Sequence, residues 1–271
     1  MNGEALLQRA VRAARRAALE AGRIQREGLL VERHVEHKGT YDLVTDIDRR
    51  CEEAILAICE QEFPGLPVMA EESAPGVRAA DLMWVIDPLD GTTNYARGYP
   101  YFCCSLALWR EGRPVVGVVY EPLRDELFEA RQGGGAFLNG RSIRVSDTAE
   151  LSEALLATGI PYDRLENPQT NLDRFCLLTM CSRGVRRGGS AALDLCHTAC
   201  GRLDGYWELR INPWDVSAGG LMVEEAGGRV TDLRGGVFDW SGRETLASNG
   251  LLHRALIEAL SAPAPHGRCF G

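Results

Sequence analysis

The chain has 271 residues, of which 30 are Lys or Arg and 38 are Asp or Glu, so its formal net charge at pH 7 is −8. This acidic balance argues against broad nucleic-acid or membrane binding, and the length allows one large domain or two packed halves. No apolar run approaches the roughly 20 residues that cross a bilayer. The nine cysteines form no C-x-x-C pair, which predicts a reduced, cytoplasmic protein without a zinc site or a disulfide framework.

Helical and then strand periodicities dominate the first half of the chain. Apolar spacing predicts a long amphipathic helix over residues 4–27 and a second helix over 47–63. The first helix is Arg-rich, but it carries acids and lacks a cleavable apolar core, so we expect no signal peptide. Short strands are predicted over 68–73 and 82–87, and a meander of strands over 101–146.

The second half alternates strands with helices. Its predicted elements are a strand at 155–160, a helix at 168–182, a helix that starts after Gly188 and Gly189, a strand at 206–209, a helix at 214–228, strands at 229–233 and 244–249, and a helix at 251–260. We therefore expect an α+β half over residues 1–145, an α/β half over 146–261 and a flexible tail over 262–271.

Acidic residues stand where two predicted strands end and where one helix begins. They are Glu71, Glu72, Asp87, Asp90 and Asp215. Hard divalent cations such as Mg²⁺ prefer carboxylate, carbonyl and water oxygens. Pro88 fixes the turn after the second strand, so that both its aspartates can face one way and the Leu89 carbonyl is free to act as a ligand. Taken singly, each acid is more often a helix cap or part of a surface loop; together they can hold two or three ions if the loops converge.

Two helix starts expose backbone N–H groups that can bind an anion. They are the segments Gly91-Thr92-Thr93-Asn94 and Gly188-Gly189-Ser190-Ala191. Each alone is an ordinary helix N-terminus, but beside a metal cluster the first becomes a good phosphate seat.

A third acidic segment, TYDLVTDID, places Asp42, Asp46 and Asp48 just before a helix. We expect Asp46 to cap that helix and Asp48 to sit in its first turn, where a carboxylate complements the helix dipole. A catalytic role for Asp48 requires Thr92 nearby, which local spacing cannot establish.

Several other enzyme classes lack their motifs here. The haloacid-dehalogenase phosphatases use D-x-D after a strand, whereas this chain has D-x-x-D, and it contains no GxxxxGK[ST], GxGxxG, GxSxG or HExxH. We expect Cys196, His197 and Cys200 to pack or face solvent rather than bind a metal. The pair Arg186-Arg187 is either solvated surface, an interface or an anion contact.

Five segments together resemble the inositol monophosphatase family of lithium-sensitive, magnesium-dependent phosphatases, and most of all its bacterial members. They are KGTYDLVTDID, MAEES, WVIDPLDGTTNY, GGSAALDLCHTACGRLDGYWE and NPWDVSAGGLMVEEAGG. The resemblance runs from the first helix to about residue 260. It implies a layered αβαβα sandwich of the inositol monophosphatase / fructose-1,6-bisphosphatase type, usually dimeric.

The resemblance also implies roles for single residues. The metal ligands would be Glu71, Asp87, the Leu89 carbonyl, Asp90 and Asp215. Asp48, Thr92 and Glu71 would be catalytic, with Thr92 and Asp48 activating the attacking water. The substrate contacts would be Gly91 and Thr92 at the phosphate, and Asp90, Gly189, Ser190, Ala191, Glu208 and Asp215 on the rest of the substrate. Gly188 stands where relatives often carry a bulkier apolar residue, which predicts a looser start to the helix that follows.

The expected reaction is Mg²⁺-dependent hydrolysis of an inositol monophosphate by metal-activated water, with no protein nucleophile. A carboxylate at Glu208 would accept hydrogen bonds from a polyol and repel a second phosphate, unless it is simply an exposed strand residue. The alternatives are another substrate (fructose-1,6-bisphosphate, histidinol phosphate, a nucleotide 3′-phosphate or NADP), or a regulatory protein that binds transcription machinery through Arg183, Arg186 and Arg187. Inhibition by Li⁺ and a homodimer are further expectations from the resemblance.

Overall fold

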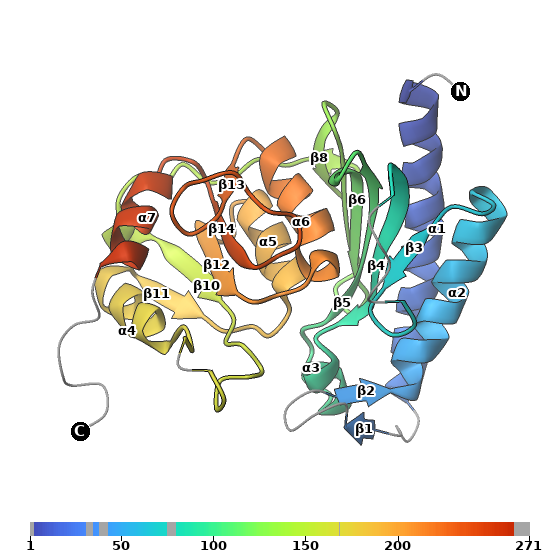
Figure 1. Ribbon diagram of the computed structural model, residues 1–271, viewed down its shortest axis with the longest axis horizontal. Coiled ribbons are helices and arrows are strands. Elements are labelled where there is room, and N and C mark those ends of the chain that lie inside the picture. Colours follow the sequence, from blue (N-terminus) through green and yellow to red (C-terminus); the bar gives the residue numbers. More distant parts are fainter. Residues whose placement is uncertain (1–2, 31–34, 38–42, 75–79, 168, 263–271) are drawn as a thin grey trace.

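Two large β-sheets form the frame of the protein, and helices lie between them and on their outer faces (Figure 1). The computed structural model describes residues 3–30, 35–37, 43–74, 80–167 and 169–262. The predicted tail beyond residue 262 and the acid Asp42 therefore lie outside the described residues.

The first sheet has seven strands in the order β3-β4-β5-β6-β7-β8-β9. Their bounds are β3 (Val68–Ala70), β4 (Leu82–Asp90), β5 (Cys103–Arg110), β6 (Arg113–Glu121), β7 (Glu126–Arg131), β8 (Gly135–Leu138) and β9 (Arg141–Ser142). β3 pairs with β4 in parallel, and every later pair is antiparallel, as expected for strands joined by short turns. The predicted meander is confirmed.

The second sheet has five strands in the order β11-β10-β12-β14-β13. Their bounds are β10 (Leu155–Thr158), β11 (Gly184–Arg186), β12 (Gly205–Leu209), β13 (Arg229–Thr231) and β14 (Glu244–Ser248). β10 pairs in parallel with β11 and β12, and β14 is antiparallel to both its neighbours. The sequence did not predict β11, because three residues beside a helix show no periodicity. A small separate pair joins β1 (Val35–His37) to β2 (Leu43–Thr45).

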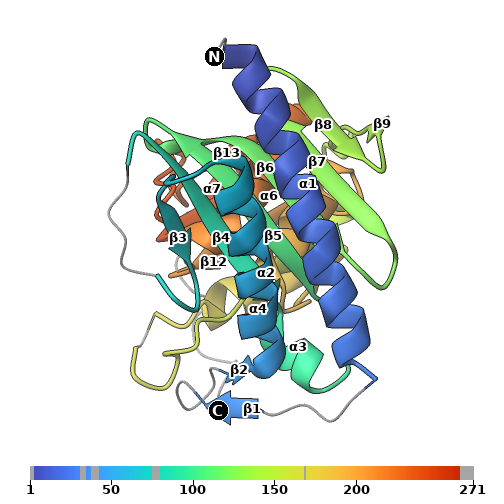
Figure 2. The ribbon, with the colours of Figure 1, turned by 90° about the vertical axis from the view of Figure 1, so that its right-hand side faces the viewer.

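Two helices cover the outer face of the seven-stranded sheet. α1 (Gly3–Gly28) and α2 (Asp46–Glu62) lie side by side there, in agreement with the two predicted helices (Figure 2). α1 buries a row of alanines and Gly22, because small residues let a helix lie close to a sheet.

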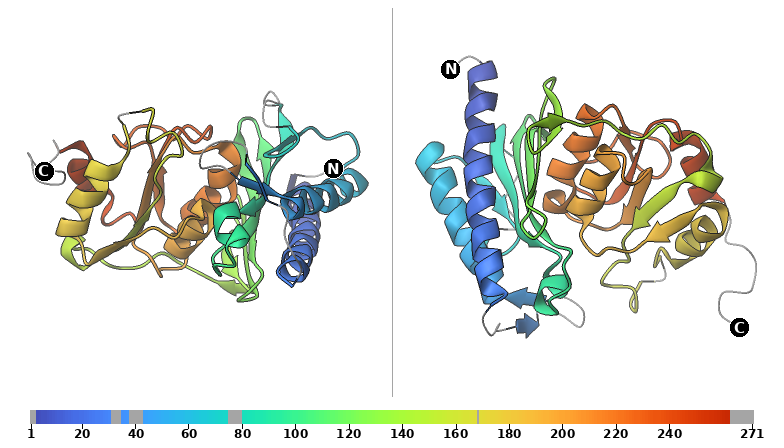
Figure 3. Two further views of the ribbon diagram at one scale, coloured as in Figure 1. Left: turned by 90° about the horizontal axis from the view of Figure 1, so that it is seen from below. Right: turned by 180° about the vertical axis from the view of Figure 1, so that it is seen from behind.

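The remaining long helices form the other two layers. α5 (Ala191–Ala199) and α6 (Pro213–Glu225) lie between the sheets, and α4 (Leu172–Cys181) and α7 (His253–Ser261) cover the far face of the five-stranded sheet (Figure 3). The protein is thus the expected αβαβα sandwich. The predicted helix at 168–182 starts later than expected, at Leu172, because Asn171 has the left-handed φ of 70° and cannot continue a helix.

The first sheet ends at Ser142 and the second begins at Leu155, with a short 3₁₀ helix at Leu151–Glu153 before it. The division of the chain into halves near residue 146 stays a prediction. None of the helices in the described ranges combines the length and hydropathy needed to cross a membrane. Eight of the cysteines lie in those ranges, and all eight are free thiols.

Candidate active site

Three of the predicted acids meet at one point. Asp87 and Asp90 lie at the end of β4, where a bulge interrupts its pairing with β5, and Asp215 lies in the first turn of α6. Each offers a carboxylate oxygen within 4.8 Å of the others. Asp87 is 1% and Asp90 9% exposed, so water screens this cluster poorly.

Burial and mutual repulsion both act on the charges of this cluster. Burial, together with the neighbouring acids Glu71, Asp90 and Asp215, raises the pKa of Asp87 well above its usual range. The pKa of Asp215 is raised in the same way by burial, Asp90 and Glu71. Hard oxygen donors brought together in this way fit a divalent cation such as Mg²⁺, whose charge would offset the repulsion.

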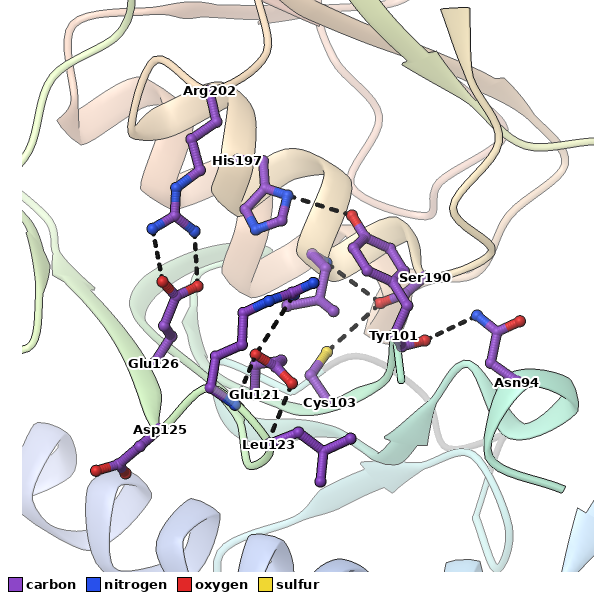
Figure 4. Close-up of polar contacts among 12 residues, drawn as sticks. Asn94, Tyr101, Cys103, Glu121, Leu123, Asp125, Glu126, Ser190, His197 and Arg202 are labelled. Carbon is purple, nitrogen blue, oxygen red and sulfur yellow. Dashed lines mark hydrogen bonds and ion pairs between the residues drawn. The ribbon is translucent and has the colours of Figure 1, made fainter. Parts of the chain in front are cut away.

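Asp90 also ties the first sheet to the start of α5. Its Oδ2 accepts hydrogen bonds from Ser190 Oγ at 2.7 Å and from the backbone N–H of Ala192 at 2.8 Å. Burial raises the pKa of Asp90 to about 6, and these donors oppose the rise. The hydroxyl of Ser190 is therefore the donor to Asp90. Cys103 Sγ lies 3.6 Å from the same hydroxyl (Figure 4).

Asp48 belongs to a capping box at the start of α2. Thr45 is the N-cap, its backbone N–H donates to Asp48 Oδ2 at 2.8 Å, and its hydroxyl accepts from the N–H of Ile47. The prediction that Asp46 caps this helix is wrong, because Thr45 takes that position and Asp46 becomes the first helical residue. Asp48 is fully buried, which raises its pKa to about 6.

Thr92 joins Asp48 to the acid cluster. Its hydroxyl lies 3.0 Å from Asp48 Oδ1 and 3.0 Å from the carbonyl oxygen of Leu89, across 44 residues of sequence in the first case. Thr92 begins the short helix α3 (Thr92–Ala96), whose N-cap Gly91 has φ 94°. A side chain at Gly91 would come within 2.9 Å of the Tyr101 carbonyl oxygen, so this turn requires glycine. The expected pairing of Thr92 with Asp48 is present.

A pocket of about 90 Å³ opens beside the acids. It is lined by Asp90, Asp215, Gly189, Ser190, Ala191, Asp194, Thr158, Gly159, Ile160, Pro161, Tyr162, Arg187, Glu208, Arg210, Ile211 and Asn212. The carboxylate of Glu208 accepts a hydrogen bond from the Tyr206 hydroxyl, and burial raises its pKa to about 7. Glu208 is half-buried and faces the pocket, which rules out the simple exposed strand position.

The expectation of a loose helix start at Gly188 is wrong. A side chain there would overlap the ring of Tyr101, which fills the space. Tyr101 is itself fixed. Its hydroxyl donates to Asp194 Oδ1 at 2.6 Å. Its carbonyl accepts from Asn94 Nδ2 at 2.7 Å (Figure 4).

The cysteine–histidine segment of α5 packs as expected. Cys196 is buried, and His197 Nδ1 lies 3.3 Å from the Tyr101 hydroxyl, close to the ion pair of Arg202 with Glu126 (Figure 4). The three arginines of the regulatory alternative, Arg183, Arg186 and Arg187, are all exposed, and Arg187 also lines the pocket.

Gln25 is a buried neighbour of the site that the sequence did not single out. It lies in α1, and its Nε2 donates to the carbonyl of Pro88 at 2.9 Å, inside the D-P-L-D turn. The sequence could have indicated its burial, because Gln25 lies at helical spacing on the same face of α1 as the buried alanines Ala14, Ala18 and Ala21.

Comparison with known proteins agrees with this geometry. A model described as "Inositol monophosphatase family" matches residues 6–263. An inositol-1-monophosphatase of Synechocystis is 49% identical over 84% of this chain and 80% of its own length. A protein of Pasteurella multocida named Nus factor SuhB is 42% identical over 85% of this chain and 86% of its own length.

Solved structures agree as well. The inositol monophosphatase from Anabaena has a TM-score of 0.87 and 46% identity, covering 97% of this chain and 98% of its own. An IMPase/NADP phosphatase complexed with Mg²⁺ and phosphate has a TM-score of 0.79 and 27% identity, covering 90% and 92%. With its acid cluster and its match along nearly the whole length, the chain belongs to the inositol monophosphatase family, a family of phosphatases.

Proposed function

We propose that this protein hydrolyses myo-inositol monophosphate to inositol and phosphate with Mg²⁺ as its cofactor. The observation that carries the proposal is the buried group of Asp87, Asp90 and Asp215, with the Thr92–Asp48 hydrogen bond next to it. The family match and the names of the relatives support inositol monophosphate over the other phosphates.

Asp87, Asp90 and Asp215 would hold Mg²⁺, together with Glu71 and the carbonyl of Leu89. Bound metal would supply Lewis-acid stabilisation of the phosphate and the leaving oxygen and would make water a better nucleophile. Phosphate monoesters are among the slowest compounds to hydrolyse without a catalyst, so such stabilisation has to be large.

Thr92 and Asp48 would handle the proton of the attacking water. When Thr92 donates to Asp48 Oδ1, its oxygen keeps lone pairs that can accept a hydrogen from water. The proton can then pass through the hydroxyl to Asp48, whose other oxygen is held by Thr45. The backbone N–H groups of Gly91 and Thr92 would bind the phosphate.

The pocket supplies contacts to the alcohol part of the substrate. Its lining includes Gly189, Ser190, Ala191 and Glu208. A carboxylate at Glu208 would accept hydrogen bonds from hydroxyl groups and would disfavour a second phosphate there. This supports a monophosphate of a hydroxyl-rich alcohol rather than a bisphosphate.

A turnover panel with Mg²⁺ tests the proposal. It compares inositol monophosphate with fructose-1,6-bisphosphate, histidinol phosphate, a nucleoside 3′-phosphate and NADP. We expect the highest kcat/KM for inositol monophosphate and no turnover after chelation of Mg²⁺. A strong preference for any other member of the panel would contradict the proposed substrate.

Two further properties rest on the same family membership. We expect a homodimer, to be checked by light scattering, and inhibition by Li⁺, to be checked in the turnover assay. The eight free cysteines support a reducing compartment such as the cytoplasm, because free thiols persist there.

A further inference from the structure

Asn171 connects three segments of the chain behind the pocket. It precedes α4, is 4% exposed, and has a left-handed backbone with φ 70°. Its Nδ2 donates to Thr158 Oγ1 at 2.9 Å and to the carbonyl of Gly159 at 2.8 Å, and its Oδ1 accepts from Trp207 Nε1 at 2.8 Å. Both ends of the amide are therefore bound to buried neighbours.

Asn171 fixes Trp207, the residue before Glu208, both directly and through Thr158. Asn171 holds the indole of Trp207, and Thr158 Oγ1 donates to the backbone carbonyl of Trp207 at 2.6 Å. Since Asn171 also donates to Thr158, the side chain and the carbonyl of Trp207 are held by one connected set of hydrogen bonds. The peptide that leads into Glu208 has little freedom to rotate.

The third bond fixes the surface against which Glu208 lies. A methyl group added at Gly159 would overlap both carboxylate oxygens of Glu208, so the carboxylate rests directly on this glycine. Asn171 holds the carbonyl of Gly159 at 2.8 Å. Glu208 and Gly159 both line the pocket beside Asp90, whereas Asn171 lies outside that lining.

The left-handed backbone at residue 171 does not by itself require an asparagine, since glycine adopts this conformation freely. A buried amide is unfavourable unless its polar atoms are hydrogen-bonded, so an asparagine is stable here only with these three hydrogen bonds. Trp207, which it binds, belongs to the apolar core between the five-stranded sheet and the helices α4 and α7.

We propose that Asn171 is a positioning residue, which sets the place of the Glu208 carboxylate and of Gly159 and thereby the affinity for the polyol part of the substrate. The proposal rests on the proposed function, in which Glu208 accepts hydrogen bonds from substrate hydroxyls. It differs from a purely structural role because its effect must depend on Glu208 and on the hydroxyls of the substrate.

The test variant is Asn171→Gly, which keeps the backbone conformation and removes the amide. Asn139→Gly is the matched control. Asn139 also has a left-handed φ, of 49°; its Oδ1 accepts from the Leu127 N–H and its Nδ2 donates to the Asp125 carbonyl, but it lies in the exposed turn between β8 and β9. A second variant, Asn171→Asp, keeps the acceptor for Trp207 and replaces the donor at Gly159 with an oxygen.

KM and kcat are measured for inositol monophosphate and for 4-nitrophenyl phosphate, which has no hydroxyl groups. Asn171→Gly and Asn171→Asp should raise KM for inositol monophosphate roughly tenfold, as loss of a supporting hydrogen bond commonly does. KM for 4-nitrophenyl phosphate should change less than twofold. Asn139→Gly should change neither. In Asn171→Gly, the indole N–H resonance of Trp207 should shift, and in Asn171→Asp it should stay close to its wild-type position.

The decisive measurement is a double-mutant cycle with Glu208→Gln. If Asn171 acts through Glu208, Asn171→Gly should add almost nothing to the KM of Glu208→Gln. Full addition of the two effects, or equal losses on both substrates, would overturn the positioning role. Wild-type turnover in the same experiment tests the proposed function separately: if another phosphate is preferred, the proposed substrate is wrong, and the cycle on that phosphate still decides the role of Asn171.

Discussion

Replacing Asp48 with asparagine should separate its catalytic role from its structural one. Thr45 directs two donors, its N–H and its hydroxyl, at Asp48 Oδ2, so the amide oxygen of an asparagine must take that side. The NH₂ group of the asparagine then faces the Thr92 hydroxyl, in the place of Asp48 Oδ1, which accepts a hydrogen bond from that hydroxyl at 3.0 Å in the wild type. The Thr92 hydroxyl must turn its hydrogen to the Leu89 carbonyl, which is also 3.0 Å away.

The helix cap survives this change, but the route for the proton does not. We therefore expect Asp48→Asn to keep a thermal midpoint close to wild type, whereas Asp48→Ala should lose about 1 kcal/mol of the free energy of unfolding with its cap. The kcat of Asp48→Asn should fall roughly 100- to 10,000-fold, the usual contribution of a general base.

Single-turnover assays on Asp48→Asn, Thr92→Ala and the double variant check this reasoning. Because the two residues would act as a unit, the double variant should be little slower than the slower single variant. Losses that multiply fully, or an Asp48→Asn enzyme within a few-fold of wild-type kcat, would refute the pairing.

Further outcomes follow from the same geometry. Asp90→Asn and Asp215→Asn should each abolish turnover while circular dichroism stays native, and near-wild-type activity at low Mg²⁺ would contradict the metal assignment. Gln25→Met removes the donor to Pro88 and should raise the Mg²⁺ concentration for half-maximal binding, measured by calorimetry, with little change in KM for substrate once Mg²⁺ saturates. Burial raises the pKa of Glu208 to about 7 from its ordinary 4.5, so the native protein keeps a proton that the unfolded chain releases, and this group lowers stability as pH rises between those values. Urea unfolding in EDTA gives the free energy of unfolding of Glu208→Gln minus that of wild type. This difference should be more positive at pH 8 than at pH 4, by roughly 3 kcal/mol at most. An equal difference at both pH values would contradict it.

Local rules of sequence predicted most of the layered fold and the place of the acids. The strand that carries Asp87 near its end and the helix that carries Asp215 in its first turn are visible in hydrophobic periodicity alone. The αβαβα arrangement, by contrast, came from the resemblance, because periodicity does not say which face of a sheet a helix covers.

Long-range contacts account for what the sequence could not supply. The bond from Asn171 to Trp207 spans 36 residues, and Gln25 reaches Pro88 across 63. The sequence also placed the helix cap one residue too late. Both Thr45 and Asp46 are good cap residues, and Thr45 takes the position because its backbone N–H donates to the side chain of Asp48.

The three clustered acids repel one another, so packing has to hold them together. Asp87 in β4 pairs with Ser105 in β5, and the Ser105 hydroxyl donates to the Trp214 carbonyl at 3.2 Å, directly before Asp215. Further along the same face, a side chain on Gly117 of β6 would come within 2.9 Å of the backbone of Ala218, so α6 lies against the sheet with no room to slide. The core between the sheets therefore sets the distance from Asp215 to the acids of β4 before any cation binds, which is the preorganisation that a metal site requires.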